Sequence, residues 1–193
     1  PELLGARGMY VQDDTGGLLV YLEHGKYPPL SLHDWVLLTG SMAERRGEKQ
    51  IRVYANYDSV LTMPGDGVPA VSIRTGEVGE RYEGLLVRVQ GTITRRTATS
   101  FEVDDGTGTA HVLVRSGTGL TTADLGNGNE VAVVGIISQY DATAPFDDGY
   151  RLLPRSPADV TAIGASVEAE EAAKRQLVIP TTLPRTGDAL PFW

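Results

Sequence analysis

Cysteine is absent from this chain of 193 residues, and lysine occurs only at Lys26, Lys49 and Lys174. Without cysteine the chain has no disulfide, no thiolate zinc ligand and no thiol nucleophile. The formal net charge is −8. This charge disfavours a general polyanion binder, because affinity for phosphate backbones comes mostly from lysine and arginine. Within the given residues, no segment has the pattern of a signal peptide or a membrane span.

Motifs of the common catalytic sites are also missing. There is no G-x-S-x-G nucleophile turn, no Walker glycine loop and no G-x-G-x-x-G run that opens a helix. The histidines are His24, His33 and His111, and no two of them have the spacing of paired metal ligands. We therefore expect a protein that is not an enzyme and that carries no cofactor or metal.

The chain contains a repeated stretch. Met9–Leu22 (MYVQDDTGGLLVYL) and Phe101–Val114 (FEVDDGTGTAHVLV) align without a gap. Each has an alternating apolar run, a turn of Asp, Thr and Gly, and a second alternating run, which is the pattern of a β-hairpin. The repetition predicts two copies of one β-domain.

The second copy has a strand that the first copy lacks. Gly84–Thr94 (GLLVRVQGTIT) alternates apolar and polar residues ahead of the second hairpin, as a half-buried strand does. Residues 1–7 supply only the end of such a strand and the loop after it. Because Pro1 opens almost directly onto the first hairpin, we expect that sequence upstream has been removed.

Two further strands follow each hairpin. A polar connection leads to the strands Asp34–Gly40 and Asn129–Gly135, and each of these ends at a glycine, which often marks a bulge or a sharp bend. A loop and a final strand then close each copy, at Gln50–Ala55 and at Gly149–Leu153. Five antiparallel strands of this kind can close a small barrel.

The predicted fold class is all-β. It consists of two tandem OB-like five-stranded Greek-key barrels, the first lacking its own first strand, with a short C-terminal helix and an extended tail. The predicted boundaries are barrel 1 over 1–62, a linker with a short helical turn over 63–83, barrel 2 over 84–163, the helix over 164–176 and the tail over 177–193.

Several motifs resemble those of a known family. They are Thr75–Gly79 (TGEVG), Gly84–Arg88 (GLLVR), Asp104–Gly108 (DDGTG), Ser138–Tyr140 (SQY) and Tyr150–Asp159 (YRLLPRSPAD). Together they resemble the tandem OB-like domains of secreted and cell-surface bacterial proteins, which accompany extracellular nucleases, metallophosphatases and lamin-tail-like modules. The resemblance implies an extracellular or cell-surface location in a bacterium and an accessory role.

The tail carries a second resemblance. Leu183, Pro184, Arg185, Thr186 and Gly187 resemble the LPxTG sorting signal that surface-anchoring transpeptidases cut between Thr and Gly. The resemblance implies attachment to the cell wall or membrane through the C-terminus. A plain tail rich in Pro and Thr is the alternative.

The missing strand suggests a role for the tail. Leu177, Val178 and Ile179 form a short β-prone run, and we expect this run to fill the gap in a first barrel by strand addition. Within one molecule this would join the two domains, whereas between molecules it would be head-to-tail and would build a filament. Phe192 and Trp193 are the expected aromatic anchors of such a contact.

A possible ligand face lies on the first copy. Tyr10 and Tyr21, helped by Arg52 and Tyr54, have the chemistry to stack bases of a single strand. The alternative is that the tyrosines cover the barrel or an interdomain contact.

The paired aspartates Asp13, Asp14, Asp104 and Asp105 are weak calcium candidates, because carboxylates can hold Ca²⁺. Tight hairpin turns demand the same residues, and this interpretation is favoured.

The leading prediction is a non-enzymatic, extracellular or cell-surface structural protein that forms a homo-oligomer or polymer through its tail. The alternative is an accessory module of an extracellular nuclease or hydrolase that binds single-stranded nucleic acid or glycan, although the charge disfavours nucleic acid.

Overall fold

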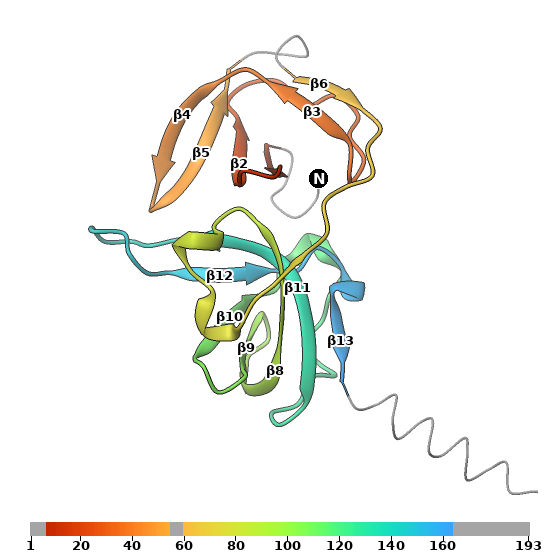
Figure 1. Ribbon diagram of the computed structural model, residues 1–193, viewed down its shortest axis with the longest axis vertical. Helices are drawn as coiled ribbons and strands as arrows, with labels where there is room; N and C mark the ends of the chain where they lie inside the picture. The colour runs from red at the N-terminus through yellow and green to blue at the C-terminus, as the bar shows by residue number, and fades with distance from the viewer. Residues whose placement is uncertain (1–6, 55–59, 164–193) are drawn as a thin grey trace, which may run out of the picture. The chain divides into compact units, whose positions relative to one another are not determined.

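The computed structural model describes residues 7–54 and 60–163, and all of these belong to one compact unit. In this part of the chain the regular structure is strands and short 3₁₀ helices (Figure 1). The predicted helix over 164–176 and the tail over 177–193 lie outside the described residues. The same is true of the predicted assembly residues and sorting motif, which the tail contains.

Five strands close a barrel in the second half of the chain. They run in the order β8-β9-β10-β12-β11, and β11 pairs again with β8 (Figure 1). Neighbours are antiparallel except for β10 and β12, which are parallel. This arrangement is compatible with the predicted OB-like barrel. The strands are β8 (Leu86–Arg96), β9 (Ser100–Asp104), β10 (Thr109–Leu113), β11 (Glu130–Gln139) and β12 (Tyr150–Leu153).

The barrel core follows from the alternation of apolar residues along these strands. Each inward-facing side chain contributes roughly 1.5–3 kcal/mol by leaving water. Ten core residues are no more than 1% exposed: Val87, Val89, Ile93, Phe101, Val103, Val112, Val131, Val133, Ile137 and Leu152.

Strand β8 is long and bent. Its register against β9 shifts between Ile93 and Arg95, as at a β-bulge. Gly91 lies just before the shift, where a Cβ atom would stand 2.6 Å from the carbonyl oxygen of Asp104. The bend lets one strand pair with β9 and β11 and so close the barrel.

Two short strands extend this sheet beyond the predicted strands. β7 (Val71–Ser72) runs parallel to β8, and β13 (Val160–Ala162) runs antiparallel to β11. Between β7 and β8 lie the 3₁₀ helices η2 (Thr75–Glu77) and η3 (Glu80–Tyr82), within the segment predicted to contain a short helical turn.

The first half of the chain forms a four-stranded sheet with the order β1-β2-β5-β4, in which β2 and β5 are parallel. The buried apolar cluster of this half consists of Val20, Leu22 and Val53 on the sheet and Val60 on β6. A separate pair of strands, β3 and β6, is antiparallel. The strands are β1 (Gly8–Gln12), β2 (Gly17–Leu22), β3 (Trp35–Leu38), β4 (Ser41–Arg45), β5 (Glu48–Val53) and β6 (Val60–Met63).

Both predicted hairpins are confirmed. β1 pairs with β2 so that Tyr10 is opposite Leu19, and β9 pairs with β10 so that Glu102 is opposite His111. The prediction of a loop between Gly40 and Gln50 is wrong, because most of that segment forms strand β4. Arg46 and Gly47 both have positive φ angles, of 57° and 88°, and this permits a two-residue hairpin turn between β4 and β5.

The glycines predicted to mark bends each lie against a neighbouring strand. A Cβ atom on Gly40 would stand 2.5 Å from the carbonyl oxygen of Arg52 on β5. A Cβ atom on Gly135 would stand 2.9 Å from the carbonyl oxygen of Leu153 on β12. Both positions therefore require a residue without a side chain.

We expect Gly135→Ala to lower the free energy of unfolding by about 1–3 kcal/mol, because the new methyl group overpacks the contact with β12. Urea unfolding followed by circular dichroism measures this change. Gly16→Ala is the control, since a Cβ atom there would have nothing within 4 Å. Equal stability of the two variants would contradict the close packing of β11 on β12.

Candidate functional site

The candidate site is the contact between the first sheet (β1, β2, β4 and β5) and the barrel, here called the junction. Two backbone N–H groups of the barrel donate across it. Leu86 N donates to Oε1 of Gln12 at 2.7 Å, and Asp141 N donates to the carbonyl oxygen of Arg46 at 2.9 Å. The guanidinium of Arg46 also lies 4.7 Å from the ring centre of Tyr140.

The backbones meet at two glycines. A Cβ atom on Gly17 would stand 2.2 Å from the carbonyl carbon of Gly84, which real side chains never do. Gly84 also has a φ of +76°, a conformation that favours glycine. Because neither residue has a side chain, the start of β2 can approach the backbone two residues before β8.

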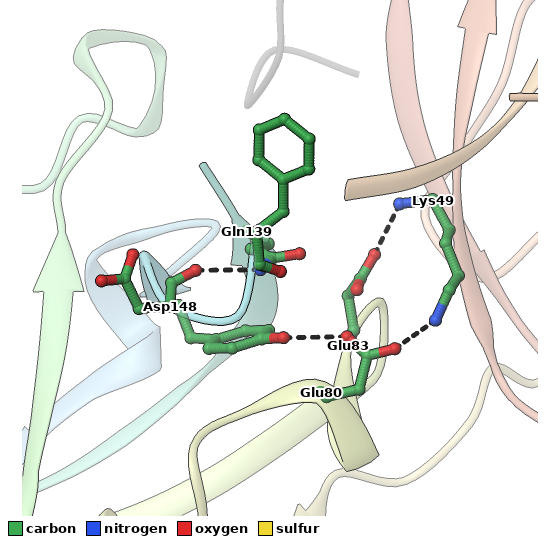
Figure 2. Close-up of polar contacts among 7 residues, drawn as sticks. Lys49, Glu80, Glu83, Gln139 and Asp148 are labelled. Carbon is green, nitrogen blue, oxygen red and sulfur yellow. Dashed lines mark hydrogen bonds and ion pairs between the residues drawn. The ribbon is translucent and has the colours of Figure 1, made fainter. Parts of the chain in front are cut away.

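Charged side chains gather beside this contact. Lys49 on β5 uses both of its nitrogens: its backbone N donates to Glu83 Oε1 at 2.8 Å, and its ammonium forms an ion pair with Glu80 (Figure 2). The Tyr150 hydroxyl on β12 donates to the second oxygen of Glu80 at 2.8 Å. The junction thus contains a polar network that joins β5, η3 and β12.

The network shifts the acidity of its members in opposite directions. The hydrogen bond from Lys49 lowers the pKa of Glu80, and the hydrogen bond from Tyr150 acts in the same direction. The hydrogen bond to Glu80 raises the pKa of Lys49. Burial raises the pKa of Glu83 to about 7. The pKa values of these two carboxyl groups are therefore shifted in opposite directions.

A cavity of about 540 Å³ opens beside the network. Its wall includes the loop between β11 and β12, which Gln139 holds in place by donating to the carbonyl oxygens of Phe146 and Asp148 at 2.8 and 2.9 Å (Figure 2). The lining residues include both acidic and aromatic side chains: Glu44, Gly47, Lys49, Val78, Gly79, Glu80, Pro145, Phe146, Asp147 and Tyr150.

The predicted ligand face is divided between two places. Tyr10 belongs to the junction: its hydroxyl bonds to Glu48 at 2.5 Å, and it lies beside Ser138 and Arg151 of the barrel. Burial raises the pKa of Tyr10. This placement matches the alternative interpretation, in which the tyrosine covers an interdomain contact.

The other three residues of that face lie together. Tyr21 is opposite Arg52 on the neighbouring strand, and the Arg52 guanidinium lies 5.6 Å from the ring centre of Tyr54. Tyr54 is 52% exposed. Glu23 forms an ion pair with Arg52 and so offsets the positive charge that a phosphate would need.

The calcium candidates act in hairpin turns. Asp13 accepts hydrogen bonds from Thr15 and Gly16. Asp105 accepts from Thr107 on the same turn and also from Thr75, whose hydroxyl lies 2.7 Å away, so it joins the turn to η2. These hydrogen bonds lower the pKa of Asp105.

The remaining candidates give no metal site. Asp104 accepts from Gly106 N and from the Thr109 hydroxyl, while Asp14 is exposed. Among residues 7–54 and 60–163, no three or more His, Asp or Glu side chains are grouped to hold a metal ion.

Sequence reasoning did not find the junction residues Lys49, Glu80, Glu83 and Tyr150. No local pattern identifies them, because Lys49 and Glu80 are far apart in the chain and Tyr150 is farther still. The run Thr75–Glu83 was the nearest signal, since a short helical turn was predicted there.

No protein-family model matches this chain, and no curated protein matches it. Among solved structures, the chain is similar to one described as OBody AM3L09 bound to hen egg-white lysozyme. The identity is 20%, the TM-score is 0.39, and the match covers 50% of this chain and 97% of that chain.

In the part of the chain that the structure describes, no helix has the length and apolar character needed to cross a membrane.

We expect Gly17→Val to weaken the junction by about 1–3 kcal/mol, because the side chain would collide with the backbone at Gly84. Amide hydrogen exchange measures the effect, since exchange at Leu86 and Asp141 should become faster than at Ile93, which is bonded within the barrel. Gly16→Val is the neighbouring control. Unchanged exchange at Leu86 in the Gly17 variant would contradict the close approach.

Proposed function

We propose that this chain is a non-enzymatic structural protein of a bacterial surface or the extracellular space, built from two OB-like copies. It assembles head-to-tail when the C-terminal residues of one molecule add a strand to the first copy of the next. The observation that supports the proposal is that, within residues 7–54 and 60–163, β1 has a paired strand on one edge only.

A comparison with the pairing of β8 supports the proposal. In the barrel, β8 pairs with β9, the first strand of the second hairpin, and with β11. By the sequence repeat, β1 corresponds to β9. Among residues 7–54 and 60–163, however, β1 pairs with β2 alone. An unpaired edge of this kind is a template for another strand.

Apolar side chains are exposed on the strands that follow. Trp35 and Leu37 on β3 are 61% and 68% exposed, and Met63, opposite Trp35 on β6, is 65% exposed. Large exposed apolar groups that lie together are typical of an interaction surface. They support an assembly contact on the first copy.

The donor in this proposal is the run Leu177, Val178 and Ile179, with Phe192 and Trp193 as anchors beyond it. A strand that leaves one molecule and enters the next makes a heterologous contact, which repeats into a filament. The motif Leu183–Gly187 would attach the end of such a filament to the cell surface.

Val178→Pro tests the assembly. Proline lacks the backbone N–H that a donor strand needs, so the variant should sediment as a monomer while the intact chain forms polymers as its concentration rises. Analytical ultracentrifugation and negative-stain imaging measure this.

Ala189→Pro is the matched control, because it places a proline in the same tail outside the donor run, and it should still polymerise. If the intact chain is a monomer at all concentrations, the proposed assembly is wrong.

A second candidate function is an accessory module that holds single-stranded nucleic acid or glycan. It is favoured by the exposed ring of Tyr54, with Arg52 beside it and Tyr21 on the adjoining strand. Aromatic rings next to a guanidinium are the usual platform for unpaired bases. The ion pair between Glu23 and Arg52 and the net charge of −8 weaken this candidate.

For this second candidate, Tyr54→Ala should reduce binding of single-stranded DNA by about tenfold at low salt, because one stacked base is lost. Filter binding at several salt concentrations measures it. Tyr140→Ala is the matched control, since that tyrosine is also exposed and also lies under an arginine. No salt-sensitive binding by the unmodified chain would remove the nucleic-acid form of the candidate.

A further inference from the structure

If Glu83 is ionised, only one of its two carboxylate oxygens accepts a hydrogen bond from the described residues. Its Oε1 accepts from the backbone N of Lys49 at 2.8 Å. Its Oε2 is buried and has no hydrogen-bond donor among the residues that the structure describes. The pKa of the Glu80 carboxyl is lowered by hydrogen bonds from Lys49 and Tyr150 and, to a smaller extent, by one with the side chain of Glu83. Two ionised carboxylates in such contact repel each other, whereas one shared proton turns the repulsion into a hydrogen bond.

We propose that Glu83 is protonated in the closed junction, where it donates to Glu80, and that loss of this proton loosens the contact between the first sheet and the barrel. The junction is then a pH-sensitive contact that is tight in mildly acidic medium and weaker in alkaline medium. This inference is independent of the proposed tail-driven assembly.

The charges around Glu83 explain why it, rather than Glu80, keeps the proton. From β5, the ammonium of Lys49 pairs with Glu80, and Glu48 bonds to the Tyr10 hydroxyl from β1. From β12, Tyr150 donates to Glu80. The remaining charged group on β12 that faces this network is Arg151, which interacts with Glu48 and Tyr10.

Glu83 therefore receives one neutral backbone donor, while Glu80 receives a cation and a hydroxyl. A carboxyl with a cationic partner stays ionised, and a half-buried one without such a partner is protonated more readily.

The direction of the pH dependence follows from the protons that each state binds. Burial raises the pKa of Glu83 from the ordinary 4.5 to about 7. Between these two pH values, Glu83 is protonated in the closed junction but ionised when the two surfaces are separated. The stability of the closed junction therefore falls as the pH rises through this window and is constant above it. Glu80, with its lowered pKa, and Lys49, with its raised pKa, change charge outside this window.

Glu83→Gln reproduces the protonated state at every pH. Its side-chain oxygen can accept from Lys49, and its NH₂ group can donate to Glu80 without titrating. The matched control is Glu130→Gln, which changes an exposed glutamate on β11 in the same way.

The test combines two measurements on the full chain. Carbon-13 NMR of the glutamate carboxyls should give Glu83 a midpoint near 7. Amide exchange at Leu86 and Asp141, divided by that at Ile93, should rise by about tenfold between about pH 6 and about pH 8.5. In Glu83→Gln this ratio should stay flat, and in Glu130→Gln it should rise as in the unmodified chain.

A Glu83 midpoint near its ordinary 4.5 overturns the proposal. So does an exchange ratio that does not change with pH in the unmodified chain, because the proton then has no effect on the contact. If Glu83→Gln fails to fold, these two measurements on the unmodified chain decide the matter.

Discussion

Backbone pairing along one strand, β8, is the constraint on which the barrel depends. Its N–H and C=O groups bond to β9 on one edge and to β11 on the other, so that the sheet closes on itself. Closure removes the unpaired edges and directs Val87 and Val89 into a core from which water is excluded. The register shift after Ile93 makes this possible, because an unbent strand cannot follow both partners.

The first sheet has no such strand among the described residues, and its order β1-β2-β5-β4 stays open. It is held against the barrel by the junction instead. That contact combines a close backbone approach at Gly17 and Gly84 with polar bonds from Gln12 and Lys49. Polar contacts depend on charge state more than apolar ones do, so we expect the junction to respond to pH more than the apolar core of the barrel does.

The predictions that succeeded depended on local chemistry. The two hairpins could be predicted because Asp13 and Asp105 bond to residues two or three positions away, within one turn. The strand β4 was missed, because Ser41–Arg45 is mostly polar and its pattern does not stand out from a loop. It forms because the turn at Arg46 and Gly47 brings it against β5.

The sequence alone determined the two hairpins and the five strands of the second copy, since each follows from neighbouring residues or from a repeat that can be read directly. The tertiary structure decided which residues meet at the junction and the opposite directions in which the pKa values of Glu80 and Glu83 are shifted. Those outcomes depend on burial and on the distances among Lys49, Glu80 and Glu83, which exist only after the first sheet has packed against the barrel.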